Sequence, residues 1–174
     1  YEYVFLKDLN LGLCKGCFAC ISKGEDACPL QDSRDEIARK MEACDAVILA
    51  CPNYAANVPW IMKNFIDRFA YTAHRPKYFS QRFMLVVTSG SYMGVNSVMK
   101  ALSFIASGGR IVSRLTVFHS PGMNDKKKAL QEKRIEKAAK VFVRALSRKK
   151  ASGPPLSFLM WFSAFKALSA VSRN

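Results

Sequence analysis

Four cysteines lie within fifteen residues near the start of the sequence, and their spacing is suited to chemistry. They are Cys14, Cys17, Cys20 and Cys28, arranged C-x2-C-x2-C-x7-C and followed at once by Pro29. Each two-residue gap can form a tight turn, and Gly16 and Gly24 permit the positive φ angles that such turns use. The four sulfurs can therefore face one point and bind an inorganic centre.

Three interpretations of this cysteine segment are open. Bacterial ferredoxins bind a [4Fe-4S] cluster through C-x2-C-x2-C-x3-C-P runs, and the segment keeps the first two gaps and the final Cys-Pro pair. Zinc also takes four thiolates, but its usual pattern is two separated C-x2-4-C pairs. The third interpretation is reduced thiols without a ligand, or one oxidised pair. We expect the cluster, because the packed triplet matches the ferredoxin pattern better.

The length of 174 residues suits one compact domain, and 50% apolar content is ordinary for a globular protein. We expect a domain over residues 1–150 with a cysteine-rich insertion at 10–32, then a linker and an apolar helix over 151–174. No apolar run reaches the roughly 20 residues that span a bilayer, and no secretory signal leads the sequence. We therefore expect a cytoplasmic protein, where cysteines stay reduced.

The net charge of +14 is concentrated in the last third, where residues 110–174 hold fifteen Lys and Arg against three Asp and Glu. Such a surface attracts an acidic protein, an anionic membrane or nucleic acid. Nucleic acid is the least expected, because aromatic residues are not interleaved with the basic ones. The apolar segment 156–171 is expected to pack on its own chain or on a second copy in a homo-oligomer. Attachment to a membrane surface is the alternative.

Apolar runs that alternate with segments of helical periodicity predict an α/β fold. The expected strands are residues 1–9, 45–51, 82–88 and 111–118. The expected helices are residues 34–43, 60–71, 95–106, 126–150 and 156–171. The run 45–51 is apolar throughout, which is typical of a parallel strand buried on both faces. This order predicts a doubly wound three-layer sandwich with a parallel sheet.

Other side chains have structural explanations. Asp32 or Ser33 is expected to cap the helix over 34–43, and Glu36, three residues after Ser33, completes a capping box. Lys63 and Asp67 are spaced to form an ion pair on one helix face. Cys51 ends an apolar run and is expected to behave as a small hydrophobe.

Two loops follow expected strands at the edge where parallel sheets bind ligands, residues 52–58 and 88–94. They offer aromatic faces, amide and hydroxyl groups, and glycines that let a backbone come close, which are the contacts that a flavin ring needs. For either loop alone, an ordinary strand-to-helix connection is the alternative. The candidate flavin residues are Pro52, Asn53, Tyr54, Ala55, Asn57, Thr88, Ser89, Gly90, Ser91, Tyr92, Met93 and Gly94.

The segments CKGCFAC, DAVILACPNYAANVPWIMKNFIDRF and VVTSGSYMG resemble the iron-sulfur flavoprotein branch of the NAD(P)H-dependent FMN reductase group, over roughly residues 1–95. The most specific part is formed by Pro52, Tyr54, Lys63, Phe65, Asp67 and Arg68. The resemblance implies a flavodoxin-like fold, FMN held by the two loops, and a [4Fe-4S] cluster on the four cysteines.

Members of this group begin with a central strand and a Ser/Thr-rich loop whose backbone amides bind the FMN phosphate. That unit is absent here, the sequence starts at Tyr1 within an expected strand, and its first methionine is Met41. We therefore expect a piece of a longer protein that lacks the first strand and helix of the fold.

The resemblance also implies an FMN-dependent oxidoreductase. Electrons are expected to pass from a one-electron donor such as ferredoxin through the cluster to FMN and on to a small acceptor. We expect no catalytic acid or base among the side chains, and a cationic surface favours an acidic ferredoxin. One alternative is an FMN or quinone reductase that uses NAD(P)H without a cluster. An alternative of another class is a non-catalytic metal-binding interaction module.

Overall fold

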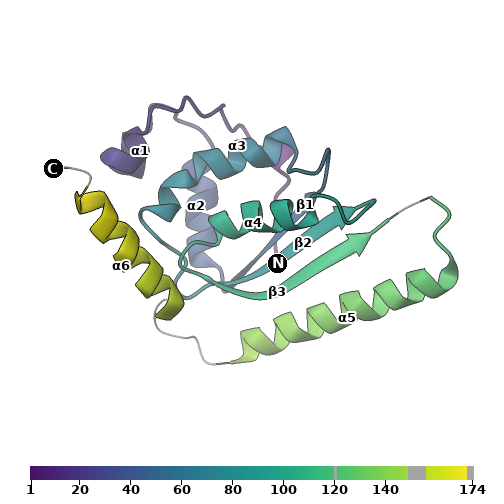
Figure 1. Cartoon of the computed structure of the whole chain (residues 1–174). Coiled ribbons are helices and arrows are strands. Elements are labelled where there is room, and N and C mark those ends of the chain that lie inside the picture. Colours follow the sequence, from purple (N-terminus) through teal and green to yellow (C-terminus); the bar gives the residue numbers. More distant parts are fainter. Residues whose placement is uncertain (120, 149–155, 172–174) are drawn as a thin grey trace.

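The computed structural model describes residues 1–119, 121–148 and 156–171. Within these residues, a parallel sheet of three strands lies at the centre, in the order β1-β2-β3. The strands are β1 Ala46–Pro52, β2 Arg82–Ser89 and β3 Arg110–Phe118. Helices cover both faces of the sheet (Figure 1). The predicted three-layer α/β sandwich is therefore confirmed.

Three helices form the layer on one face: α2 Arg34–Ala43, α3 Trp60–Arg68 and α4 Val95–Ile105 (Figure 1). On the other face lies the long helix α5, Asp125–Ser147, whose first turn is capped by Asn124. The shorter elements are α1 Ala19–Ser22 and the 3-10 turns Leu6–Asp8, Glu25–Ala27 and Ala70–Ala73. Helix α6, Leu156–Val171, is the last described element.

The central strand β2 supplies side chains to both layers of the core. Phe83, Leu85 and Val87 have no exposed surface and pack with the helices on the α3 side. Met84 lies on the opposite face, where it clusters with Phe142 of α5. Side chains alternate between the faces of a strand, so one continuous apolar run fills two cores.

The strand expected over residues 1–9 is a wrong prediction. Residues 1–5 have no regular secondary structure, and Leu6–Asp8 form a 3-10 turn. The rings of Tyr1, Tyr3 and Phe5 are exposed and contact one another. A strand needs a neighbour to pair its backbone groups, and no described strand pairs with this segment. The aromatic and β-branched composition of residues 1–9 is therefore not enough to form a strand.

The strand over 45–51 exists as β1, but it is not buried on both faces as predicted. Leu49 and Cys51 are buried on the α3 side, whereas Ile48 on the opposite face is 55% exposed. β1 is at the edge of the described sheet, and α5 packs against β3 and β2. An apolar run is buried on both faces only where a helix covers each face.

The other helices and strands form close to their expected ranges. The helix predicted over 60–71 ends at Arg68, and the chain continues as the 3-10 turn Ala70–Ala73. The predicted pair on α3 is confirmed, since Lys63 Nζ lies 2.7 Å from Asp67 Oδ2. The exposed charges of this pair cover the outer face of the helix.

The last part of the chain is only partly described. The linker predicted at 151–155 and the final residues 149–150 of the predicted basic helix lie outside the described residues. Leu156, Met160 and Trp161 of α6 are exposed. Within the described residues, no helix is long and apolar enough to cross a membrane. The domain boundary and the role of α6 stay predictions.

Candidate functional site

All four cysteines of the predicted cluster motif line one small cavity, which we call the cysteine cavity. Its volume is about 30 Å³. Its lining includes Cys14, Cys17, Cys20 and Cys28, the first residue of α2, Arg34, and the last two residues of α3, Asp67 and Arg68. All four are free thiols; Cys14 and Cys17 are exposed, and the other two are half-buried. The donor set of this cavity, four thiols, is the one that a four-iron cluster takes.

Left-handed backbone turns shape the cysteine segment. Gly16, Phe18 and Gly24 have φ angles of 63°, 57° and 118°. Glycine adopts such angles without strain, which is the role expected of Gly16 and Gly24. Phe18 has a side chain and is strained by about 1–2 kcal/mol at this angle. Phe18 directly precedes helix α1, which carries Cys20 into the wall of the cavity.

Helix α3 holds the start of the cysteine segment through Asn64. Asn64 Oδ1 accepts a hydrogen bond from Cys14 N at 3.0 Å, and Asn64 Nδ2 donates to Gly12 O at 3.2 Å. The Asn64 side chain is buried, so these bonds satisfy groups that water does not reach. Asn64 was not identified from the sequence. Apolar periodicity predicts which face of a helix is buried, but not which backbone groups a polar side chain on that helix binds.

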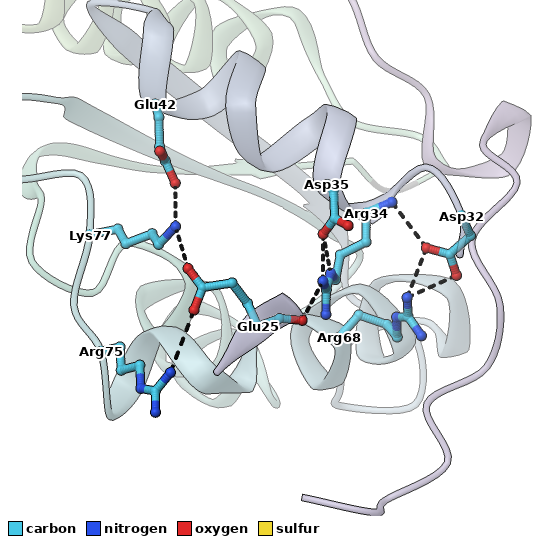
Figure 2. A network of polar contacts seen from close by, with 8 residues as sticks. All are labelled: Glu25, Asp32, Arg34, Asp35, Glu42, Arg68, Arg75 and Lys77. Atoms are coloured by element: carbon cyan, nitrogen blue, oxygen red, sulfur yellow. Dashed lines mark hydrogen bonds and ion pairs between the residues drawn. The ribbon is translucent and has the colours of Figure 1, made fainter. Parts of the chain in front are cut away.

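A buried ion pair holds the end of the segment. Arg68 Nη2 of α3 lies 2.8 Å from both carboxylate oxygens of Asp32 (Figure 2). Asp32 also accepts from Gly12 N at 2.9 Å and from Arg34 N at 3.1 Å. Asp32 therefore supplies the side-chain acceptor at the start of α2, as one of the two predicted capping residues. Ser33, the N-cap residue, makes no side-chain cap bond, so the predicted capping box is wrong. A carboxylate fixed by a guanidinium is a stronger acceptor than a hydroxyl.

Arg34, the first residue of α2, fixes the middle of the segment. Its side chain is almost fully buried, and Nη2 donates to the backbone oxygen of Glu25 at 2.8 Å (Figure 2). Nε donates to Asp35 Oδ1 at 2.7 Å, which compensates the buried charge. The guanidinium carbon also lies 5.6 Å from the centre of the Tyr71 ring.

Charged side chains tie the same segment to the loop that precedes β2. Lys77 Nζ lies 2.8 Å from Glu25 Oε1 and 2.8 Å from Glu42 Oε1 (Figure 2). The hydrogen bond from Lys77 lowers the pKa of Glu25. Burial acts to lower the pKa of Lys77, but the hydrogen bonds with the two glutamates outweigh it and raise that pKa.

The thiols of the cavity influence one another electrostatically. Burial raises the pKa of Cys20, and the neighbouring Cys28 and Cys14 raise it further. The neighbouring Arg34 acts in the opposite direction and lowers the pKa of Cys20, but its effect is smaller. Among the described residues, no three His, Cys, Asp or Glu side chains converge closely enough to hold a single metal ion. Four thiols around one cavity fit a cluster, in which each thiolate binds a different iron atom.

The two loops predicted to hold a flavin lie against each other at the carboxyl edge of the sheet. Asn53 Nδ2 donates to Ser89 Oγ at 3.0 Å and to Met93 O at 2.7 Å. The backbone N of Asn53 donates to Thr88 O at 2.8 Å. These bonds join residues far apart in the sequence and make the loops one structural unit.

The first loop contains a strained turn. Tyr54 and Asn57 exchange backbone hydrogen bonds of 3.0 and 2.9 Å, and Ala55 and Ala56 between them have φ angles of 49° and 61°. Such turns usually use glycine or asparagine, and each alanine is strained by about 1–2 kcal/mol. Gly94 of the second loop permits a close approach, because a Cβ there would lie 2.2 Å from Ala56 Cα.

Asn53 presents an acceptor that the protein leaves without a partner. Because Nδ2 makes two hydrogen bonds, the amide orientation is fixed, and Oδ1 is buried without a bond. Tyr54, Tyr92 and Met93 are largely exposed in the same two loops. A flat ring with N–H groups at its rim matches this unpaired acceptor and these aromatic faces. The residues present therefore fit the ring of FMN.

The remaining predicted flavin residues belong to the same unit. Pro52 ends β1, Asn57 Oδ1 accepts from Val58 N at 2.8 Å, and Ser89 Oγ donates to Ser91 O at 2.6 Å. Gly90 is exposed and lies beside the backbone of His119. The structure thus brings the two loops together, and their contact with a flavin stays a prediction.

The larger of the two described cavities lies elsewhere. Its volume is about 730 Å³, and Lys100, Phe104, Arg110 and Trp161 are among its lining residues. Arg110 begins β3, so this cavity opens at the amino ends of the strands. It is therefore at the opposite edge of the sheet from the loops with the unpaired Asn53 acceptor.

Comparison with known proteins agrees with this fold and these sites. The family model described as NADPH-dependent FMN reductase matches residues 1–123, so the chain belongs to this family. The resemblance stated from the sequence is confirmed. Membership also supports the prediction of a flavin-dependent oxidoreductase and of FMN as its cofactor.

Curated relatives point to one branch of the family. An iron-sulfur flavoprotein of Archaeoglobus fulgidus is 45% identical over 75 residues, which are 43% of this chain and 33% of that protein. An iron-sulfur flavoprotein of Methanosarcina thermophila is 40% identical over 67 residues, 38% of this chain and 34% of that protein. The chain therefore spans about a third of the length of the curated relatives it matches, within the iron-sulfur flavoprotein branch.

A solved structure supports the fold over nearly the whole chain. RosB, determined with bound 8-demethyl-8-formylriboflavin-5'-phosphate, covers 99% of this chain and 72% of its own, with a TM-score of 0.55. The two sequences are 11% identical, so the likeness concerns the fold alone. This likeness agrees with the α/β fold that the sequence predicts.

Proposed function

We propose that the chain is part of an FMN-dependent oxidoreductase that receives electrons singly through a [4Fe-4S] cluster and delivers them from FMN to a small acceptor. The observation that carries this proposal is that four cysteines line one cavity against α3, the helix that follows the flavin loop after β1. Family membership supports FMN, and the names of the relatives support the cluster.

The loops after β1 and β2 bind and orient the flavin ring. Asn53 Oδ1 accepts from a ring N–H, because the other side of this amide is already bonded within the protein. Tyr54 and Tyr92 offer aromatic faces, and Gly94 keeps the two loops in contact. Bound FMN accepts one or two electrons, which allows single-electron delivery to serve a two-electron reduction.

The cysteine segment binds the cluster through Cys14, Cys17, Cys20 and Cys28. Asn64 and the Asp32–Arg68 pair hold the two ends of the segment on α3. This helix has nine residues and a length of about 13 Å. It begins after the loop that follows β1, and its last two residues line the cysteine cavity. In this proposal, these side chains position the cluster relative to the flavin. No side chain is assigned as a catalytic acid or base.

The electron donor in this proposal is an acidic one-electron carrier of the ferredoxin type. The net charge of +14 supports such a partner, because a cationic surface attracts an acidic protein and speeds their encounter. Oxygen, peroxide, quinones or a further carrier are suitable acceptors for reduced flavin.

Anaerobic reconstitution of the chain with iron and sulfide tests the cluster. We expect about four iron and four sulfide per chain, with a broad visible absorption that dithionite bleaches. Cys17→Ser should lose most of the iron, because Cys17 lines the cavity. Cys44→Ser is the matched control, because Cys44 does not line the cavity, and it should keep the iron. Full iron in Cys17→Ser, or no iron in the unaltered chain, contradicts the proposal.

A second candidate is direct reduction of FMN by NADPH without a cluster. The description of the matching family model, NADPH-dependent FMN reductase, favours it. The two functions separate in stopped-flow measurements on the FMN-loaded chain with and without iron. Rapid flavin bleaching by NADPH supports the second candidate, whereas bleaching that requires iron and reduced ferredoxin supports the first.

A further inference from the structure

Arg68 is a buried cation whose guanidinium is only partly used by the protein. Its side chain is 2% exposed, and it lines the cysteine cavity. Nη2 lies 2.8 Å from both oxygens of Asp32, whereas Nε and Nη1 are buried without a hydrogen-bond partner. A buried donor left unpaired costs about 1–3 kcal/mol, and more when it is charged. Two such donors on one side chain indicate an acceptor that binds in the cavity.

The surroundings of Arg68 determine what that acceptor is. Asp32 already receives bonds from Arg68, Gly12 N and Arg34 N, so it is not free to turn toward the other nitrogens. The cavity is also lined by Asp67, whose carboxylate is paired with Lys63, and by the four cysteines, whose neutral thiols are weak acceptors. Thiolate and inorganic sulfide are anionic, and they accept charge-assisted hydrogen bonds from a guanidinium.

We infer that Arg68 donates its Nε–H and Nη1–H to the sulfurs of an anionic iron-sulfur centre in the cysteine cavity and thereby raises its reduction potential. This inference rests on the proposed function. A cluster held by four thiolates is negative and becomes more negative on reduction, so a buried cation beside it favours the reduced form. Hydrogen bonds to the sulfurs act in the same direction. Asp32 holds the guanidinium in place and offsets part of its charge.

Redox titration of the reconstituted chain, followed by visible absorption, tests this role. In Arg68→Lys the charge and a bond to Asp32 remain, but the planar set of donors is lost. Reduction should become about tenfold less favourable, which is a midpoint potential about 59 mV more negative. Asp32→Asn keeps an acceptor for Arg68 but removes the offsetting charge, so its potential should become more positive. A purely structural ion pair does not predict shifts of opposite sign.

The matched control is Arg82→Lys, since Arg82 is buried on β2 and does not line the cysteine cavity. Its midpoint potential should equal that of the unaltered chain. A folded Arg68→Lys chain that cannot be loaded, while Arg82→Lys can, also supports the donor role, because Arg68 lines the cavity and Arg82 does not. If Arg68→Lys does not fold, the midpoint potential of Asp32→Asn tests the inference alone. A more positive potential supports it, and an unchanged or more negative potential overturns it.

Unchanged potentials in loaded Arg68→Lys or in Asp32→Asn overturn this inference and leave the proposed function intact. Failure of the unaltered chain to bind iron overturns the proposed function, and the inference with it. The iron content of the unaltered chain therefore separates the two failures before any potential is compared.

Discussion

Cysteine reactivity in this chain depends on where each thiol lies. Cys51 is 3% exposed, and burial raises its pKa to about 11. Cys14 and Cys17 are exposed at the cysteine cavity. The sequence prediction that Cys51 behaves as a small hydrophobe agrees with its position in the core.

We expect iodoacetamide at pH 8 to modify Cys14 and Cys17 of the metal-free chain at least ten times faster than Cys51. The physical reason is that Cys51 is both inaccessible and protonated at this pH, since its pKa is about 11. Peptide mass spectrometry at timed intervals measures the three rates. Unfolding in urea should remove the difference, and equal rates in the folded chain contradict the structure.

Glu25 should contribute pH-dependent stability. Its folded-state pKa is lowered by the hydrogen bond from Lys77, so its stabilising effect is present above the unfolded-state pKa, about 4.3. That effect is lost as the pH falls through the folded-state pKa. Glu25→Gln should therefore lower the free energy of unfolding most near pH 7, and the difference from the unaltered chain should shrink below about pH 4.

Urea unfolding at a series of pH values measures this difference for Glu25→Gln. Glu136→Gln is the control, because the exposed pair of Glu136 with Lys140 on α5 is worth at most about 0.5 kcal/mol. A difference for Glu25→Gln that stays constant from pH 7 to pH 3 rules out the Lys77 contact as its source.

At the scale of elements, the flavin unit depends on contact between the loops after β1 and β2. Gly94 has a φ angle of 78°, and a Cβ there would lie 2.2 Å from Ala56 Cα. Gly94→Ala should separate the loops, lower the free energy of unfolding by at least about 2 kcal/mol, and weaken FMN binding. Urea unfolding and quenching of FMN fluorescence measure the two effects.

Gly122→Ala is a matched control for the loop contact. Gly122 has a similar φ angle of 76°, but no atom lies within 4 Å of a Cβ built there. It carries the backbone strain without the clash, so we expect a loss of about 1–2 kcal/mol, smaller than that of Gly94→Ala, and unchanged FMN binding. Equal losses in the two variants mean that strain alone, and not the loop contact, is responsible.

At the scale of the whole molecule, the excess of positive charge gives a prediction about the electron donor. Reduction of the loaded chain by an acidic ferredoxin should slow by about tenfold when salt rises from about 0.05 M to 0.5 M. Replacing both Lys126 and Lys127, which are exposed at the start of α5, by Glu should slow the reaction at low salt. Stopped-flow absorption measures both rates. Reduction by a small uncharged donor should not depend on salt, and a salt-independent ferredoxin rate contradicts steering.

The expected homo-oligomer and the alternative, attachment to a membrane surface, stay predictions. Ile48 of β1 is 55% exposed on a sheet face, and Leu156 and Trp161 of α6 are also exposed. The expected homo-oligomer and the alternative of a membrane surface both concern such apolar side chains. Sedimentation velocity for self-association, and co-sedimentation with anionic vesicles, measure the two separately.

The sequence by itself determined the alternation of strands and helices and the edge where the two loops meet, because periodicity and glycine placement are local properties. It also indicated the cysteine motif, since spacing alone shows that the sulfurs can converge. It failed for residues 1–9 and for the outer face of β1, because pairing and burial depend on neighbours that composition does not reveal.

Only the tertiary structure decided how the cysteine segment is held. Asp32 looked like part of a helix start, and Arg68 like one member of a helical motif, yet they form a buried pair across 36 positions of sequence. Asn64 and the unpaired Asn53 oxygen likewise became visible only in three dimensions. The physical reason is that hydrogen bonds and buried charges are satisfied between elements, and sequence distance gives no measure of that proximity.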